Sequence, residues 1–376
     1  MNITVVKAAL RAPLLVLSLF MATSSFAACP TNPYTLTNGQ TADASQVMAN
    51  FNNLLACVNN LTPPTVNSFR NLFIGGDFTS NPWQRGTSFS AIAANTVVYT
   101  ADRWFAYGGT GSAMSVNQQA SGGPTGFPTT LQVQRPAANT NTTLHSINQV
   151  VESVNVRPYQ GQTVTLSFYA SAGANFSAAS NNLSILAKTG TGVDEGSAAF
   201  AAGTWTGIAT PLSTTQPITA TMTRYSFTFA LASNATELGV QIGFLPTGTA
   251  GSNDDFNIAA VQIEAGNTAS SFEALPRDVV LQRCLRYYST VTYANTAFFG
   301  YIVSGGYYYA NYVLPVPMRS TPTISGIDSG DGVSGFAVTA GAFMARSPSA
   351  VTEARQATST VSQGYFGSTV TASAEL

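Results

Sequence analysis

Tyr225-Ser226-Phe227-Thr228-Phe229 and Leu238-Gly239-Val240-Gln241-Ile242 place apolar residues at every second position. Side chains of a β-strand point alternately to its two faces, so this period of two predicts strands with one apolar face. Turn-forming clusters such as 247–251 separate such segments. Many short strands divided by turns predict an antiparallel jelly-roll β-sandwich at 67–277. The same alternation recurs at 131–134, 164–168 and 258–263.

A segment before this region has a helical pattern. Asp43 and Gln46 have the form of a capping box, and Pro63 ends the helix. Its apolar residues alternate spacings of four and three, as in the seam of a coiled coil. About two heptads are too short to be stable alone, so the helix packs either on its own β-domain or on copies of itself. We favour a homo-oligomer with a trimeric helix bundle, and assign 28–66 to an N-terminal arm and helix. The seam residues are Val47, Phe51, Leu54, Val58 and Leu61.

The residues after 277 form a third region. A short helix is expected from Asp278 to Tyr288, with Val280 and Cys284 on one side. Aromatic-rich strands follow, including Tyr307-Tyr308-Tyr309. We therefore expect a small C-terminal β-domain at 278–376.

The first residues have the layout of a secretion signal. Lys7 and Arg11 precede a short apolar run at 14–21, and Ser25-Phe26-Ala27 offers small residues at the cleavage positions. This predicts a signal peptide at 1–27 and a secreted, periplasmic or cell-surface protein. No later stretch is long and apolar enough for a membrane span.

Three cysteines are present. Export permits a disulfide, and Cys29 with Cys57 is the economical pair because it closes a short loop. The alternative is a lipoprotein site with Cys29 lipidated. Cys284 is expected to be a free, buried thiol.

Charge excludes several functions. Only 8% of the residues are charged and the net charge is −1, so we expect no binding to nucleic acid or to anionic membranes. His145 is the only histidine, which argues against a catalytic triad and a structural zinc site. Glycoside hydrolysis needs only two carboxylates and stays open. The candidates are Asp77, Asp102, Glu152, Asp254, Asp255 and Glu264.

Structural roles compete with catalysis for these carboxylates. Asp102, next to Arg103 and Trp104, is expected to form a buried ion pair that fixes a strand end. Asp254 and Asp255 lie in a Gly/Ser/Asn turn, where acidic side chains are solvated or bind Ca²⁺. Asp77 and Asp255 are therefore candidate ligands of a structural calcium, and no other cofactor is expected.

Sugar binding requires a flat aromatic platform beside hydrogen-bonding groups. The alternative is that these rings fill cores and interfaces, as aromatic residues commonly do. Tyr307 and Tyr309 share one face of a strand and Tyr308 lies on the other, so one side must be exposed or covered by a partner. The candidate ligand-binding residues are Trp83, Tyr99, Trp104, Tyr107, Trp205, Tyr307 and Tyr309.

Several motifs occur together in a fixed order. Residues 71–78 read NLFIGGDF, 83–86 read WQRG and 99–104 read YTADRW, followed by GQTVTLSFYA at 161–170 and AVQIEAG at 260–266. This series resembles phage-type tail-fibre modules, which look like carbohydrate-binding jelly rolls. The resemblance implies a lectin-like domain without a catalytic centre, presented on an oligomeric fibre or stalk.

The sequence therefore predicts a secreted, non-enzymatic protein that binds a glycan of a cell surface or matrix. The first alternative is a structural scaffold or fibre subunit whose aromatic surfaces contact other protein subunits. A polysaccharide-degrading enzyme is the second alternative.

Overall fold

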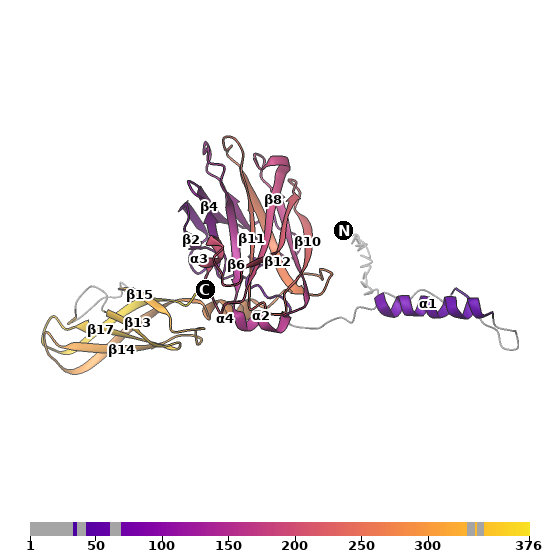
Figure 1. Cartoon of the computed structure of the whole chain (residues 1–376). Coiled ribbons are helices and arrows are strands. Elements are labelled where there is room, and N and C mark those ends of the chain that lie inside the picture. The colour runs from indigo at the N-terminus through magenta and orange to yellow at the C-terminus, as the bar shows by residue number, and fades with distance from the viewer. Residues whose placement is uncertain (1–32, 36–42, 61–68, 329–334, 337–341) are drawn as a thin grey trace, which may run out of the picture. The chain divides into compact units, whose positions relative to one another are not determined.

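The computed structural model describes residues 33–35, 43–60, 69–328, 335–336 and 342–376. Contacts divide the chain into two units, Met1–Asn67 and Ser68–Leu376. The described residues are mainly β-structured, as predicted, and their strands form two six-stranded and two three-stranded antiparallel sheets (Figure 1). Among these residues, no helix has the length and apolar character needed to cross a membrane.

The first unit contains the predicted helix, α1 (Ala44–Asn60). Asp43 caps it, since Asp43 Oδ1 accepts a hydrogen bond of 2.8 Å from the Ser45 backbone N–H. Cys29 and the signal peptide lie outside the described residues, as does the side chain of Cys57. The predicted disulfide and its lipidation alternative therefore stay predictions. Large apolar side chains of α1 that are more than half exposed are Met48, Phe51, Leu54 and Leu55.

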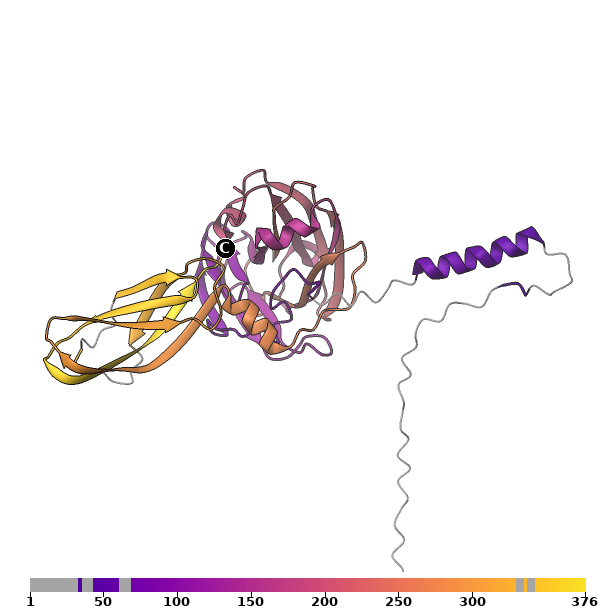
Figure 2. The ribbon, with the colours of Figure 1, turned by 90° about the horizontal axis from the view of Figure 1, so that it is seen from below.

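The second unit begins with a β-sandwich. One sheet has the strand order β1-β4-β5-β12-β7-β10 and the other β2-β3-β6-β11-β8-β9. Figure 2 views the sandwich from the end at which α2 and α4 lie. The first sheet comprises β1 (Ser88–Ala93), β4 (Ala113–Gln119), β5 (Thr130–Gln134), β12 (Asp255–Ala265), β7 (Thr163–Ala172) and β10 (Thr223–Ala230). The second comprises β2 (Val97–Tyr99), β3 (Phe105–Gly108), β6 (His145–Val151), β11 (Glu237–Phe244), β8 (Asn182–Gly190) and β9 (Ala209–Pro217).

The main core lies between these two sheets. Leu166 and Ile258 of the first sheet and Ile147 and Val240 of the second belong to one cluster of buried apolar side chains. Their alternation with polar residues put one apolar face of each sheet inward. The helical segments of this region are α2 (Ser153–Val156), η1 (Arg157–Tyr159), η2 (Ala179–Asn181) and α3 (Ser197–Ala202).

The predicted short helix after 277 is α4 (Arg277–Leu285), and Cys284 is free and buried on it, as expected. The C-terminal β-domain follows and has a core of its own, which includes Tyr312 and Phe366. One of its sheets comprises β13 (Tyr288–Ile302), β18 (Val361–Ser373) and β15 (Thr323–Asp328). The other comprises β14 (Tyr307–Val313), β17 (Ala350–Gln356) and β16 (Ala342–Ser347).

The end of the chain returns to the sandwich. Leu376 is buried in a cluster with Phe105 and Phe200, and its carbonyl accepts a hydrogen bond of 2.7 Å from Tyr99 Oη. Arg103 forms an ion pair with Glu375. The last residues therefore bind the C-terminal β-domain to the sandwich.

Candidate functional site

The three tryptophans predicted to form a sugar-binding platform are core residues. Trp83, Trp104 and Trp205 are only 6%, 0% and 3% exposed. A ring that stacks on a sugar must present its face to solvent, so the predicted platform cannot be built from these three residues. Their indole N–H groups donate to the backbone carbonyls of Phe78, Ile74 and Glu195, respectively.

Tyr99 and Tyr107 are half-buried and have local partners. Burial and the neighbouring charge of Glu375 raise the pKa of Tyr99 to about 12, so its hydroxyl stays protonated and donates to the Leu376 carbonyl. Tyr107 donates a hydrogen bond of 3.4 Å to Asn95 Oδ1. Tyr99 thus belongs to the attachment of the chain's last residues.

The two predicted calcium ligands do not converge. Asp77 accepts hydrogen bonds from the backbone and hydroxyl of Ser80, within one turn. Asp255 begins β12 and accepts from Asn257. No group of three acidic, histidine or cysteine side chains suited to a metal ion occurs in the part of the chain that the structure describes. The geometry does not support the predicted calcium site.

The predicted buried ion pair of Asp102 is present, and its partner is Arg85. Asp102 accepts hydrogen bonds of 2.8 Å from the backbone and the side chain of Gln84 and lies 3.7 Å from Arg85. Arg103 pairs instead with Glu375. Asp102 and Arg103 lie in a turn in which Arg103 has a φ of +71°, and each side chain pairs with a residue distant in the sequence.

The other candidate carboxylates also have structural partners. Each is buried, so its hydrogen bonds replace those it would make with water. Asp254 pairs with Arg135 at 2.6 Å. Glu152 binds Arg286 and Tyr287, and Glu264 binds Ser270 and Gln262.

His145 is also used structurally. It is fully buried, and its ring nitrogens lie 2.8 Å from the Thr143 carbonyl and 3.2 Å from the Ala113 carbonyl. Burial lowers its pKa, which favours the neutral ring. A neutral ring carries one N–H, so it donates to one of these two carbonyls at a time.

One pair of neighbouring acidic residues, Glu195 and Glu237, was not predicted from the sequence. Glu237 is 2% exposed, and its Oε1 accepts a hydrogen bond of 2.5 Å from the Glu195 backbone N–H. The Glu195 carboxylate accepts bonds of 2.6 Å from the backbone and hydroxyl of Thr206. No local sequence signal joins residues that lie this far apart in the chain.

The predicted exposed strand is present in the C-terminal β-domain. On β14, Tyr307 and Tyr309 are 62% and 56% exposed, whereas Tyr308 and Tyr312 point into the core. Two residues along a strand span about 7 Å, so the two rings lie side by side on one face. The structure therefore confirms the alternation that separated Tyr308 from its neighbours.

The neighbours of these two rings across the sheet are uncharged, and Tyr307 lies opposite Gln356 of β17. Tyr309 lies opposite Ala354 of β17, and Asn311 Oδ1 accepts a bond of 2.7 Å from Thr352 Oγ1. On the other side of β17, Met344 of β16 lies opposite Thr352. The side chains beside Tyr307 and Tyr309 leave more than half of each tyrosine exposed. We call this surface the tyrosine face: Tyr307, Tyr309, Asn311, Val313, Met344, Thr352 and Ala354.

The other sheet of this domain also carries exposed rings. Phe299 and Tyr301 on β13 are 78% and 80% exposed. Gly300 between them has a φ of +112°, a conformation that only glycine adopts easily. Both rings belong to β13 of the other sheet, and neither is part of the tyrosine face.

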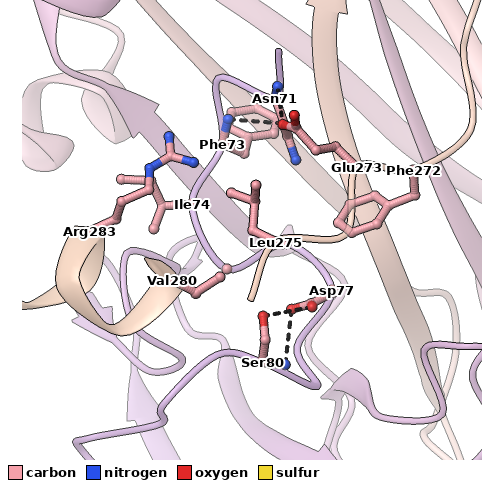
Figure 3. Close-up of a pocket in the computed structure, with 12 residues that line it drawn as sticks. Asn71, Phe73, Ile74, Asp77, Ser80, Phe272, Glu273, Leu275, Val280 and Arg283 are labelled. Carbon is pink, nitrogen blue, oxygen red and sulfur yellow. Dashed lines mark hydrogen bonds between the residues drawn. The ribbon is translucent and has the colours of Figure 1, made fainter. Parts of the chain in front are cut away.

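A small cavity lies where α4 meets the start of the sandwich (Figure 3). Asp77 and Ser80 contribute polar atoms, while Leu275 and Val280 contribute apolar ones. Its volume of about 10 Å³ is at the lower limit for a single water molecule. It is therefore too small for a sugar or a cofactor.

Comparisons with known proteins give remote likenesses only. No protein-family model matches the chain, and no curated protein matches its sequence. The enzymatically active domain of tailspike protein 4 of bacteriophage CBA120 aligns with a TM-score of 0.34 and 10% identity, over 52% of this chain and 22% of that one.

Two carbohydrate-binding modules align over similar lengths. TmCBM61, solved in complex with β-1,4-galactotriose, gives a TM-score of 0.30 and 8% identity over 52% of this chain and 99% of that one. The C-terminal family 22 carbohydrate binding module of Clostridium thermocellum Xyn10B gives 0.28 and 18% over 45% and 89%. At these TM-scores the likeness assigns no function.

Proposed function

We propose that this chain is a secreted, non-catalytic protein that binds glycans through the tyrosine face. The observation that carries the proposal is the exposure of Tyr307 and Tyr309 on one side of an otherwise well-packed strand. Leaving two large rings in water forgoes the stabilisation that burial gives, so such exposed apolar patches commonly serve binding.

The chemistry of the face suits a neutral sugar. The apolar side of a pyranose ring stacks on an aromatic ring, and its hydroxyls bond to exposed amides such as that of Asn311. Every residue of the tyrosine face is uncharged. Binding should therefore depend little on salt.

The proposal includes the absence of catalysis. The carboxylates considered for hydrolysis are buried and hydrogen-bonded, and glycoside cleavage needs two that flank a substrate. None of them belongs to the tyrosine face. A chain that binds polysaccharide at this face should release no reducing ends from it.

The binding test compares matched tyrosine variants. Affinity electrophoresis through gels of neutral polysaccharides measures binding by the wild type, Tyr307→Ala, Tyr309→Ala and Tyr301→Ala. Loss of one stacking ring costs about 1 kcal/mol, or roughly fivefold in affinity. Tyr301→Ala removes a more exposed ring from the other sheet and should leave binding unchanged.

The outcomes separate the alternatives. Equal retardation of the wild type and Tyr309→Ala would refute the tyrosine face as the binding site. Absence of glycan binding, together with self-association that Tyr309→Ala abolishes, would favour the scaffold. Release of reducing ends would favour the enzyme.

The proposal also places several copies of the chain in one assembly through α1. Phe51 and Leu54 lie on the predicted seam and are 61% and 52% exposed. Copies of the helix would bury these side chains against each other. Sedimentation of Phe51→Gln/Leu54→Gln should give a lower mass than the wild type and than the control Asn52→Gln; equal masses would refute the bundle.

A further inference from the structure

A groove of about 460 Å³ lies at the end of the sandwich that carries α2 and α4. Its volume is in the range of small-molecule sites. Leu72 and Val154 give it apolar walls, and the rings of Phe69 and Tyr159 and the guanidinium of Arg283 also line it. It contains no residue of the tyrosine face.

Arg283 is unusual among the arginines of this chain. It is half-buried, and within the described residues its guanidinium makes neither an ion pair nor a hydrogen bond. Its side chain is drawn in Figure 3, where no hydrogen bond reaches it. The arginines that do pair with an acid are Arg70, Arg85, Arg103, Arg135, Arg286, Arg319 and Arg355.

The absence of an acid partner has an energetic consequence. Burial lowers the pKa of Arg283, because a partly desolvated cation loses part of its hydration. The carboxylate of Glu273, which lies in the neighbouring cavity of Figure 3, accepts hydrogen bonds from the backbone of Arg70 and Asn71 instead. An anion in the groove would supply the missing partner.

The groove offers further contacts around this cation. The Phe69 ring is 56% exposed and its centre lies 6.0 Å from the Arg283 guanidinium carbon. Tyr159 packs on the main core with its ring, and within the described residues its hydroxyl has no hydrogen-bond partner. Asn155 adds an exposed amide. Two rings, a hydroxyl and an amide surround one unpaired positive charge.

We infer that this groove is a second glycan site, which binds an acidic sugar: a pyranose that carries a carboxylate. The carboxylate pairs with the Arg283 guanidinium, whose planar fork matches two carboxylate oxygens. The pyranose ring lies against Phe69 and Tyr159, and its hydroxyls bond to Asn155. The inference extends the proposed function to acidic glycans but does not depend on the tyrosine face.

The test uses oligogalacturonides as the acidic probe and galactose oligomers of equal length as the neutral one. Isothermal titration should show preference for the acidic probe, and raising the salt concentration should weaken binding. Arg283→Gln should lose at least tenfold in affinity. Arg277→Gln removes an exposed arginine from the same helix and should change nothing.

Further arms keep the inference falsifiable. Val154 is 60% exposed, so Val154→Asp adds a negative charge to the groove without disturbing the core and should also abolish binding. Equal affinity of Val154→Asp and the wild type would overturn the site. If inorganic phosphate competes as well as free galacturonate does, the groove binds anions in general and the claim that it recognises a sugar is refuted.

A last comparison separates this site from the tyrosine face. Tyr309→Ala should keep its affinity for oligogalacturonides whatever its effect on neutral polysaccharides. If Tyr309→Ala loses the acidic probe and Arg283→Gln does not, the groove is not the acidic site. The two proposals therefore fail in different experiments.

Discussion

Glu237 is the buried acid whose replacement gives the sharpest test of the structure. It begins β11 and is 2% exposed. Its Oε1 accepts a bond from Glu195, whereas within the described residues its buried Oε2 has no hydrogen-bond partner. Burial, with the nearby charge of Glu195 adding to it, raises the pKa of Glu237 from 4.5 to about 7.

This pKa makes stability depend on pH. The folded chain holds the proton more tightly than the unfolded chain, so the contribution is complete below pH 4.5 and is lost as pH rises through about 7. Each pH unit between the two pKa values corresponds to about 1.4 kcal/mol. The loss between acid and neutral pH is therefore at most about 3.5 kcal/mol.

Glu237→Gln removes this titration and keeps the size of the side chain. Its free energy of unfolding should exceed that of the wild type at pH 8, by at most about 3.5 kcal/mol, and should match it closely at pH 5. Urea unfolding followed by tryptophan fluorescence measures both values. Asp278→Asn, which changes an exposed acid on α4, serves as the control.

Parallel pH profiles of the wild type and Glu237→Gln would refute the reasoning. A variant destabilised equally at both pH values would mean that packing at this position, and not the charge, sets the stability.

Three other substitutions test the packing. Asp254→Asn leaves its fully buried arginine partner uncompensated and should cost about 3–5 kcal/mol in urea unfolding. Gly76→Ala would place a Cβ 2.2 Å from the Val261 carbonyl oxygen, so the backbone must shift; we expect a loss of about 1–3 kcal/mol or more and a lower thermal midpoint. Tyr99→Phe removes the bond to the Leu376 carbonyl and should cost about 1 kcal/mol, with faster carboxypeptidase release of the last residues. An unchanged midpoint or digestion rate would contradict the corresponding contact.

The period-two patterns predicted the strands, but they did not predict which outer strand faces are buried by other elements. In β10 the alternation of Tyr225–Phe229 gives one face toward the core, as expected. In β11 every residue is buried, although the pattern predicted one solvent-facing side. The reason is visible at Gly239, where a Cβ would lie 2.5 Å from the Phe200 ring. Its absence lets Phe200 of α3 cover the outer face.

Local alternation predicted the tyrosine face but could not place the tryptophans. The exposure of Tyr307 and Tyr309 could be predicted from the geometry of one strand, because it follows from Tyr308 pointing inward. Trp83 and Trp104 lie outside regular strands, so no period assigns them a side. Their burial depends on the contact of Trp104 with Phe73 and Phe78, a matter of tertiary packing.

Several of the few charged side chains of this chain form buried ion pairs. Pairs such as Arg135 with Asp254 and Arg355 with Glu353 are completely buried, and Arg103 with Glu375 fixes the last residues. A surface with few charges attracts anions weakly, and the net charge is only −1. Arg283 differs from the other described arginines that lack an acid partner, because Arg157, Arg277 and Arg346 are exposed and Arg224 donates to Ser167 and Ser270. The salt dependence of acidic-sugar binding should therefore correspond to about one ion pair, and should disappear with Arg283.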